Sequence, residues 1–424
     1  MAVRDDRSDV KQTTTGFRGP LMVQSLTSAK SKFLSLADLK ALNEKRLVII
    51  GQHVAEYGYG PNETVYNLFH GSSGIHPDSH YVSLTLPTFD FSARFFETVS
   101  RRSVVIFNSA FSFVHPNAVN ALEHCWKGNI PVIFYWHDGA WILELIEKSQ
   151  PENLYRLLQM LHRIPIAHWV VSTVVQDVIK SRLKVNADSI YVVGNTFTSH
   201  PGSIMHVRRP PEKPLKVVGV GTLAGESLYR KGGDLFCEIC SALSLSAPSN
   251  YQFSWFGAEE NSPLSAGISV PRNCNFYGFK SNWMDTLTDT DVFLLTSRDE
   301  PFGIAAMQAL SFDIPVFCFD NVGACDFVPR NCHLNSVDGF VAALKDYRSG
   351  KLSFPDGTFR KISERYEKNA MYRRLTRQDY VMSTVQMSLS SENYPKKNPR
   401  YLRALKNRIA WRIGAMRGLQ KKTK

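Results

Sequence analysis

The sequence has no run of about 18 apolar residues, the length at which a helix can cross a membrane. Residues 1–19 are polar and charged, without the apolar centre of a secretory signal. We therefore expect a cytoplasmic protein. Its composition, 43% hydrophobic and 21% charged, is typical of a chain that folds. Because 424 residues are too many for one ordinary core, we expect two domains.

Cysteine is also scarce, with 7 residues at irregular spacing. Cys237 and Cys240 form a C-x-x-C motif, but no second cysteine pair or histidine pair follows at zinc-site spacing. The same spacing fits one face of a helix. We expect buried thiols in a reducing compartment, and neither a metal ion nor a cofactor.

The net charge of +12 would suggest nucleic-acid binding if it were spread over the chain. Instead, residues 396–424 hold 11 lysines and arginines and no acidic residue, so residues 1–395 are nearly neutral. The body of the chain carries no basic, aromatic-rich signal. Nucleic acid is therefore not an expected partner.

In this tail, apolar residues recur at helical spacing between cations, which indicates a basic amphipathic helix, although Trp411 lies opposite the apolar stripe. Two interpretations stay open. In one, residues 400–424 bind an anionic membrane surface, on the inner face of the membrane, which would suit a lipid-linked acceptor. In the other, the helix docks on the protein and ends in a disordered basic segment.

Short β-branched and aromatic runs alternate with helical stretches in both halves of the chain. The runs are residues 47–51, 80–86, 103–108, 130–136 and 190–194, then 215–221, 251–257, 275–279, 291–295 and 314–319. This alternation predicts an α/β protein with two parallel sheets covered by helices. Residues 201–214, which contain four prolines, interrupt the pattern and indicate an interdomain linker. The predicted segments are an extension (1–44), two domains (45–205 and 206–371) and a basic tail (391–424).

In open α/β sheets, ligands bind at the carboxyl ends of the strands, and the second half offers three such places. In the first, a strand ends at Gly221 and Thr222, and Arg230 and Lys231 follow just before a predicted helix. Two cations and free helix amides suit a diphosphate. The alternative is a solvated Arg-Lys pair at a helix start.

The second place is the start of the next helix, where Glu300 follows a strand. Phe302, Gly303 and Ile304 would turn bare amides toward a phosphate or sugar oxygen, and Glu300 could bind sugar hydroxyls. Gln308 lies on much the same face and could hydrogen-bond a ribose. The alternative is a capping acid before an ordinary helix.

The third place, residues 321–328, is a Gly-Ala turn followed by an acid, which alone is a weak signal. In the first half, His137 and Asp138 end a strand. His137 either faces the cleft and contacts the transferred sugar or the acceptor, or it is a packed core residue. Asp138 would orient the histidine or cap the segment that follows.

Taken in order, these segments resemble the retaining family-4 glycosyltransferases. The motifs that carry the resemblance are Gly221, Lys231-Gly232, Phe256-Gly257, Phe276-Tyr-Gly-Phe279, Ser297-Arg-Asp-Glu-Pro-Phe-Gly303, Pro315-Val316 and Gly323-Ala324. The match is close over about residues 215–330. The first half is similar more loosely, through the loop at Gly58, Tyr59 and Gly60, through His137, and through residues 171–172 and 193–195.

The resemblance implies a GT-B fold, in which two Rossmann-like domains with parallel sheets face each other across a cleft. The residues that it assigns to a nucleotide-sugar donor are Gly221, Thr222, Arg230, Lys231, Phe279, Glu300, Phe302, Gly303, Ile304 and Gln308. The residues that it assigns to a glycan or lipid-linked glycan acceptor are Gly58, Tyr59, Gly60, His137 and Asp138. It further implies a retaining, metal-independent transfer assisted by His137, Glu300, Arg230 and Lys231, and a final helix, residues 372–390, that returns to the first domain.

Two positions depart from the family pattern. Gln308 replaces a glutamate, and Thr222 replaces an arginine whose charge Arg230 could supply. The leading hypothesis is transfer of a hexosyl or deoxyhexosyl group in surface polysaccharide biosynthesis. A glycogen- or sucrose-type synthase is a second enzyme hypothesis, and the chain length argues against a phosphorylase. The two departures also leave open a degenerate member that binds sugar and scaffolds a polysaccharide synthesis complex.

Overall fold

The computed structural model describes eleven stretches of the chain. They are residues 46–51, 78–84, 86–100, 102–108, 116–128, 130–149, 166–197, 213–257, 267–280, 282–367 and 370–371. The predicted N-terminal extension, the Gly58–Gly60 loop, most of the proline-rich linker, the return helix and the basic tail lie outside these stretches.

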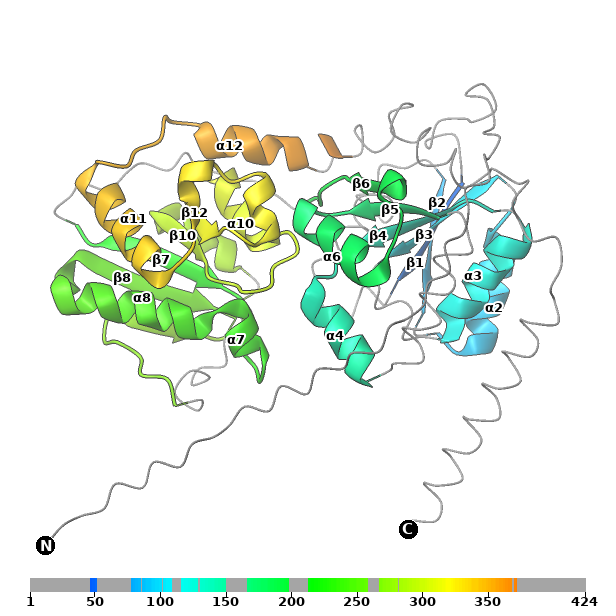
Figure 1. Ribbon diagram of the computed structural model, residues 1–424, viewed down its shortest axis with the longest axis horizontal. Coiled ribbons are helices and arrows are strands. Elements are labelled where there is room, and N and C mark those ends of the chain that lie inside the picture. The colour runs from blue at the N-terminus through cyan, green and yellow to red at the C-terminus, as the bar shows by residue number, and fades with distance from the viewer. Residues whose placement is uncertain are drawn as a thin grey trace, which may run out of the picture.

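The first half forms a six-stranded parallel sheet in the order β2-β1-β3-β4-β5-β6 (Figure 1). Its strands are β1 (Arg46–Gly51), β2 (Ser79–Ser83), β3 (Ser103–Asn108), β4 (Val132–Trp136), β5 (Ile166–Val170) and β6 (Ile190–Val192). Strands β3 and β4 are buried along their whole length, as continuous apolar runs predict for a sheet covered on both faces. The helices are α2 (Thr88–Thr98), α3 (Pro116–Gly128), α4 (Ala140–Ser149) and α6 (Thr173–Leu183).

The second half forms another six-stranded parallel sheet, in the order β12-β11-β10-β7-β8-β9. Its strands are β7 (Leu215–Val220), β8 (Tyr251–Phe256), β9 (Cys274–Tyr277), β10 (Val292–Leu295), β11 (Val316–Phe319) and β12 (His333–Leu334). The helices are α7 (Ser227–Lys231), α8 (Gly233–Ser246), α10 (Ile304–Ser311), α11 (Val337–Ser349) and α12 (Thr358–Ser363). Helix α8 packs beside α11, and α10 packs beside α12.

The structure confirms the predicted α/β class, with two parallel sheets in tandem, and it places Cys237 and Cys240 buried on α8. It corrects the prediction at Arg230 and Lys231, which we expected in a loop before a helix. They form the last turn of α7, which ends where Gly232 adopts a left-handed φ of 71° and opens α8. No helix in the described stretches is long and apolar enough to span a membrane.

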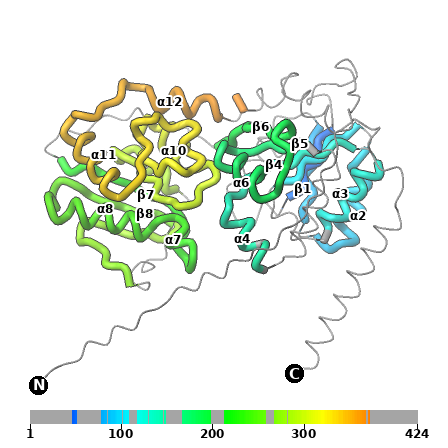
Figure 2. Tube along the Cα trace, viewed as in Figure 1, coloured from blue at the N-terminus to red at the C-terminus, as the bar shows by residue number. Residues whose placement is uncertain are grey.

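After α12 the chain runs from the second half toward the first (Figure 2). The hydroxyl of Thr196 donates to the Tyr366 carbonyl over 3.0 Å, and Phe197 forms an isolated parallel β-bridge with Glu367. Met371 is fully buried. The chain thus rejoins the end of the first half before residue 372, ahead of the segment that we predicted as the return helix.

Candidate active site

The carboxyl edge of the second sheet is built around two glycines. The amide of Gly221, which follows β7, donates to the Phe256 carbonyl over 2.9 Å, and the Trp255 indole donates to the Gly221 carbonyl over 2.8 Å. Gly257 follows β8 with a φ of 93°, and a Cβ placed on it would lie 3.1 Å from the Gly221 oxygen. Because neither glycine has a side chain, a ligand can approach the backbone closely at these strand ends.

Lys231 and Glu300 meet on this edge, although 69 positions separate them in the sequence. Lys231 Nζ lies 2.6 Å from Glu300 Oε2, and the two side chains are only 19% and 14% exposed. The stem of Lys231 crosses Gly221, where an added Cβ would lie 3.2 Å from Lys231 Cγ. The structure thus brings together two residues that the sequence assigned to donor binding, in a short ion pair with little solvent screening.

Backbone contacts join the two segments that hold this pair, the α7–α8 junction and the loop after β10. A Cβ on Gly232 would lie 1.9 Å from the Thr296 carbonyl oxygen, so the α7–α8 junction touches the loop after β10. The amide of Arg298 donates to the Arg230 carbonyl over 2.9 Å. The Arg298 guanidinium also donates to both carboxylate oxygens of Asp234 over 2.7 Å. These contacts fix the positions of Lys231 and Glu300 relative to each other.

Arg230 points toward the first half of the molecule. Its guanidinium carbon lies 4.9 Å from the ring centre of Trp141, in the first turn of α4. Its Nε atom is buried and has no hydrogen-bond partner among the described residues. The structure therefore separates two residues that the sequence treated as one cationic pair, since Lys231 binds Glu300 while Arg230 stacks across the boundary between the halves.

The first half contacts the loop after β10 through Gly139 and Trp141. The Trp141 amide donates to Asp299 Oδ2 over 3.0 Å, so the acid caps α4 from the other half of the molecule. A Cβ on Gly139 would lie 2.2 Å from Asp299 Oδ1, which leaves no room for a larger residue. Burial raises the pKa of Asp299, while the Trp141 amide and the Arg230 charge oppose that rise. This contact could not be predicted from the sequence, because its partners lie 158 positions apart.

His137 precedes this contact by two residues and is 6% exposed. The Asn195 amide nitrogen lies 3.3 Å from His137 Nδ1, and Asn195 Oδ1 accepts from the Thr196 amide, which fixes that amide group with its NH₂ toward the ring. Nδ1 is then the acceptor, and Nε2 carries the proton. Nε2 is buried without a partner among the described residues. Burial lowers the pKa of His137 to about 3, so the ring is neutral at pH 7.

Gly303 starts α10 in a left-handed conformation with a φ of 94°. The first N–H groups of a helix have no partner inside it, so α10 offers donors and a positive dipole end close to Glu300. The Phe302 ring is 3% exposed and packs on Phe327 and Tyr366, with ring centres 5.0 and 5.6 Å away. Phe302 can therefore reach a ligand only through its backbone, whereas Ile304 is half-buried on the helix.

The remaining residues that the sequence assigned to donor or acceptor binding lie in different parts of the molecule. Thr222 is exposed just past β7, Gln308 is half-buried on α10, and Asp138 is buried beside His137. Phe279, just after β9, is 87% exposed. Gly58, Tyr59 and Gly60 lie outside the described residues.

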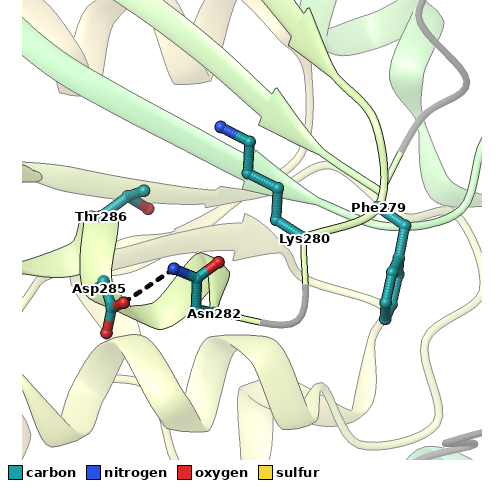
Figure 3. Close-up of a pocket in the computed structure, with 5 residues that line it drawn as sticks. All are labelled: Phe279, Lys280, Asn282, Asp285 and Thr286. Carbon is teal, nitrogen blue, oxygen red and sulfur yellow. Dashed lines mark hydrogen bonds between the residues drawn. The ribbon is translucent and has the colours of Figure 1, made fainter.

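Phe279 borders an open hollow of about 550 Å³ beyond β9, shown in Figure 3. Its other lining residues are Lys280, Asn282, Asp285 and Thr286. Lys280 Nζ lies 4.7 Å from the ring centre of Tyr277, and the Asn282 amide donates to Asp285 over 3.0 Å. The sequence identified Phe279 but missed the polar residues around it, because none belongs to a motif.

Residues 208–347 match the family model described as glycosyl transferases group 1. No curated protein matches the chain.

Among solved structures, the chain resembles a lipopolysaccharide outer core galactosyltransferase in its apo form, with 17% identity over 79% of this chain and 99% of that one, and a TM-score of 0.58. It also resembles a glycosyltransferase from Rickettsia africae, with 14% identity over 78% and 97% of the two chains and a TM-score of 0.51. A pneumococcal O-GlcNAc transferase, solved with UDP and GlcNAc, is 15% identical over 69% of this chain but only 60% of its own, with a TM-score of 0.50. At these identities the likeness shows the fold, and the chain has the GT-B fold of glycosyltransferases, with the group 1 match in its second half.

Proposed function

We propose that the chain is a retaining glycosyltransferase that moves a hexosyl or deoxyhexosyl group from a nucleotide-sugar to a glycan or lipid-linked glycan. The observation that carries the proposal is the Lys231–Glu300 ion pair at the carboxyl edge of the second sheet, beside the open N-terminus of α10. The group 1 match over residues 208–347 includes both residues.

The ion pair suits a donor that has both a diphosphate and sugar hydroxyls. When a donor enters, Lys231 can exchange the carboxylate for a phosphate oxygen, and Glu300 is then released to accept from a sugar hydroxyl. The α10 amides add donors and a positive dipole end at the same place. Together they stabilise the negative charge that grows on the leaving diphosphate, which is why we propose transfer without a metal ion.

His137 suits the transferred sugar or the acceptor better than the diphosphate. As a neutral ring with a protonated, unpartnered Nε2, it can donate one hydrogen bond to an uncharged hydroxyl. We propose that the acceptor hydroxyl attacks from the face that the leaving group vacates, with no fixed protein nucleophile. Asp138, Gly58, Tyr59 and Gly60 belong to this acceptor side in our proposal.

The biological setting that we propose is surface polysaccharide biosynthesis at the cytoplasmic face of a membrane, with residues 400–424 as the attachment. The structural neighbour named as a lipopolysaccharide galactosyltransferase agrees with this setting. Because the pneumococcal neighbour was solved with UDP, we would test uridine donors first.

The test is a thermal-shift screen with UDP, GDP, dTDP and ADP and their common sugar conjugates, followed by a transfer assay. A ligand at 100 times its Kd adds about 2.7 kcal/mol of stability. We expect one nucleotide to stabilise the wild type and Lys345→Ala, an exposed control on α11, but not Lys231→Ala. If no nucleotide stabilises the protein, the proposed donor site is wrong.

A sugar-binding scaffold is the competing function, and Gln308 and Thr222 are the residues that favour it. The two functions differ in how a Glu300→Ala variant behaves in cells. An enzyme loses its product when this carboxylate is removed, whereas a scaffold keeps the synthesis complex working. Normal polysaccharide in cells that carry only Glu300→Ala would therefore favour the scaffold.

A further inference from the structure

Three possible metal ligands gather at the edge of the second sheet, outside the proposed donor site. Cys318 on β11 and His333 on β12 are paired neighbours in the sheet register. Cys325 comes from the short turn η7 (Gly323–Asp326). One ligand atom from each residue lies within 4.8 Å of the other two. No other group of three among the described residues meets the same condition.

The separation of the sulfur atoms matches that of a tetrahedral metal site. Cys318 Sγ lies 3.9 Å from Cys325 Sγ. Two thiolates bound to one Zn²⁺ at about 2.3 Å with tetrahedral angles are about 3.8 Å apart. Cys318 is buried and Cys325 is half-buried, so the pair can be reached from the Cys325 side. The sulfurs need little movement to share an ion.

The third residue, His333, is already oriented as a ligand. Its Nε2 lies 2.8 Å from the Val328 carbonyl oxygen, an acceptor, so Nε2 carries the proton and Nδ1 carries the lone pair. A backbone carbonyl that fixes the ring in this way is the usual support of a metal-binding histidine. Arg330 Nη1 lies 3.3 Å from Nδ1, but Arg330 is exposed and can turn into solvent.

We propose that Cys318, Cys325 and His333 bind a soft divalent cation such as Zn²⁺, with water in the fourth position. On binding, the two thiols each release one proton to the solvent, the histidine binds as the neutral ring, and no oxidation takes place. Scattered cysteines gave no zinc spacing in the sequence, because the register of β11 and β12 brings this site together rather than a local motif.

The site would act on the Glu300 loop through η7. The amide of Gly323 donates to the Glu300 carbonyl over 2.8 Å, and Asp326 accepts from the Thr173 amide of α6 over 2.7 Å. An ion held by Cys325 would stiffen η7 between these two contacts. The role that we infer is structural support behind the site, separate from the transfer reaction.

The experiment is a Zn²⁺ titration of the full-length, chelator-treated protein under a phosphine reductant, against a chromophoric competitor. We expect one tight equivalent in the wild type. Cys325→Ser and His333→Ala should each bind at least tenfold more weakly. Cys240→Ser, which removes a buried thiol from α8, should bind normally. Arg330→Ala should bind severalfold more tightly, because a competing donor and a positive charge are removed.

A second measurement distinguishes loss of the metal site from poor folding of a variant. Co²⁺ bound by thiolates gives charge-transfer absorption, which should appear in the wild type and weaken in Cys325→Ser while the circular dichroism spectrum is unchanged. The proposal is overturned if Cys325→Ser and His333→Ala keep the tight equivalent, if the wild type binds none, or if Arg330→Ala binds more weakly. Each of these outcomes is independent of nucleotide binding, so it leaves the proposed transfer function untouched.

Discussion

The two sheets are alike in strand number and direction, yet their carboxyl edges differ in charge. The edge of the second sheet holds Lys231 and Glu300 in a short ion pair, over glycines that bring backbone close to a ligand. The edge of the first holds His137, a buried and neutral ring, with the buried Asp138 next to it and no cation described in the same place. This contrast fits a division of labour in which one half binds a charged leaving group and the other contacts uncharged hydroxyls.

The largest effect should come from removing the cation of the charged edge. We expect Lys231→Ala to lower the transfer rate by about 100- to 1,000-fold, because a group that faces developing negative charge is worth about 3–4 kcal/mol. Nucleotide binding should weaken as well. His137→Ala should instead lower transfer while nucleotide binding stays near the wild-type value. Equal loss of nucleotide binding in both variants, measured by calorimetry, would break the contrast between the two edges.

The backbone under the charged edge gives the next largest effect. Gly232→Ala should destabilise the protein by more than about 3 kcal/mol, because a left-handed residue costs about 1–2 kcal/mol and the new Cβ would overlap the Thr296 carbonyl. Gly225 has a φ of 53° but nothing within 4 Å of an added Cβ, so Gly225→Ala should cost only the strain. Urea unfolding of the two variants separates close contact from backbone conformation. Similar losses would show that the contact with Thr296 contributes nothing.

The buried, neutral ring of His137 should make the stability of the protein depend on pH. The unfolded chain binds a proton at His137 near pH 6.5, whereas the folded chain does so near pH 3. Between these values the unfolded state binds more protons, so the free energy of unfolding falls with falling pH, at up to about 1.4 kcal/mol per unit. His137→Asn should remove this part of the slope below pH 6.5 and change nothing above it. An unchanged slope, measured by urea unfolding from pH 4 to 8, would mean that the ring titrates normally.

The sequence predicted the two edges unequally well. Apolar runs predicted the strands of both sheets except β5 and β12, and the ordered motifs of the second half assigned Lys231 and Glu300 to the same donor site. Helices α2, α4, α7 and α11 were missed: α2 is rich in aromatic residues, α7 is only 5 residues long, and no motif surrounds α4 or α11. Contacts between distant segments could not be predicted, since Trp141 and Asp299 carry no signal for each other.

The smallest effect concerns the place where the halves meet near η7. Asp326 accepts hydrogen bonds from the Thr173 amide and hydroxyl at the start of α6, and the pair is exposed to solvent. Asp326→Asn should therefore cost about 1 kcal/mol or less in global stability, yet it should speed amide exchange at Thr173 by about tenfold. Asp177→Asn, an exposed acid further along α6, is the matched control and should change neither. Unchanged exchange at Thr173 would mean that the two halves of the molecule are held together without this contact. They would then rely on the other contacts between the halves, which include the Asp299 cap of α4, the Arg230–Trp141 stacking and the Thr196–Tyr366 hydrogen bond.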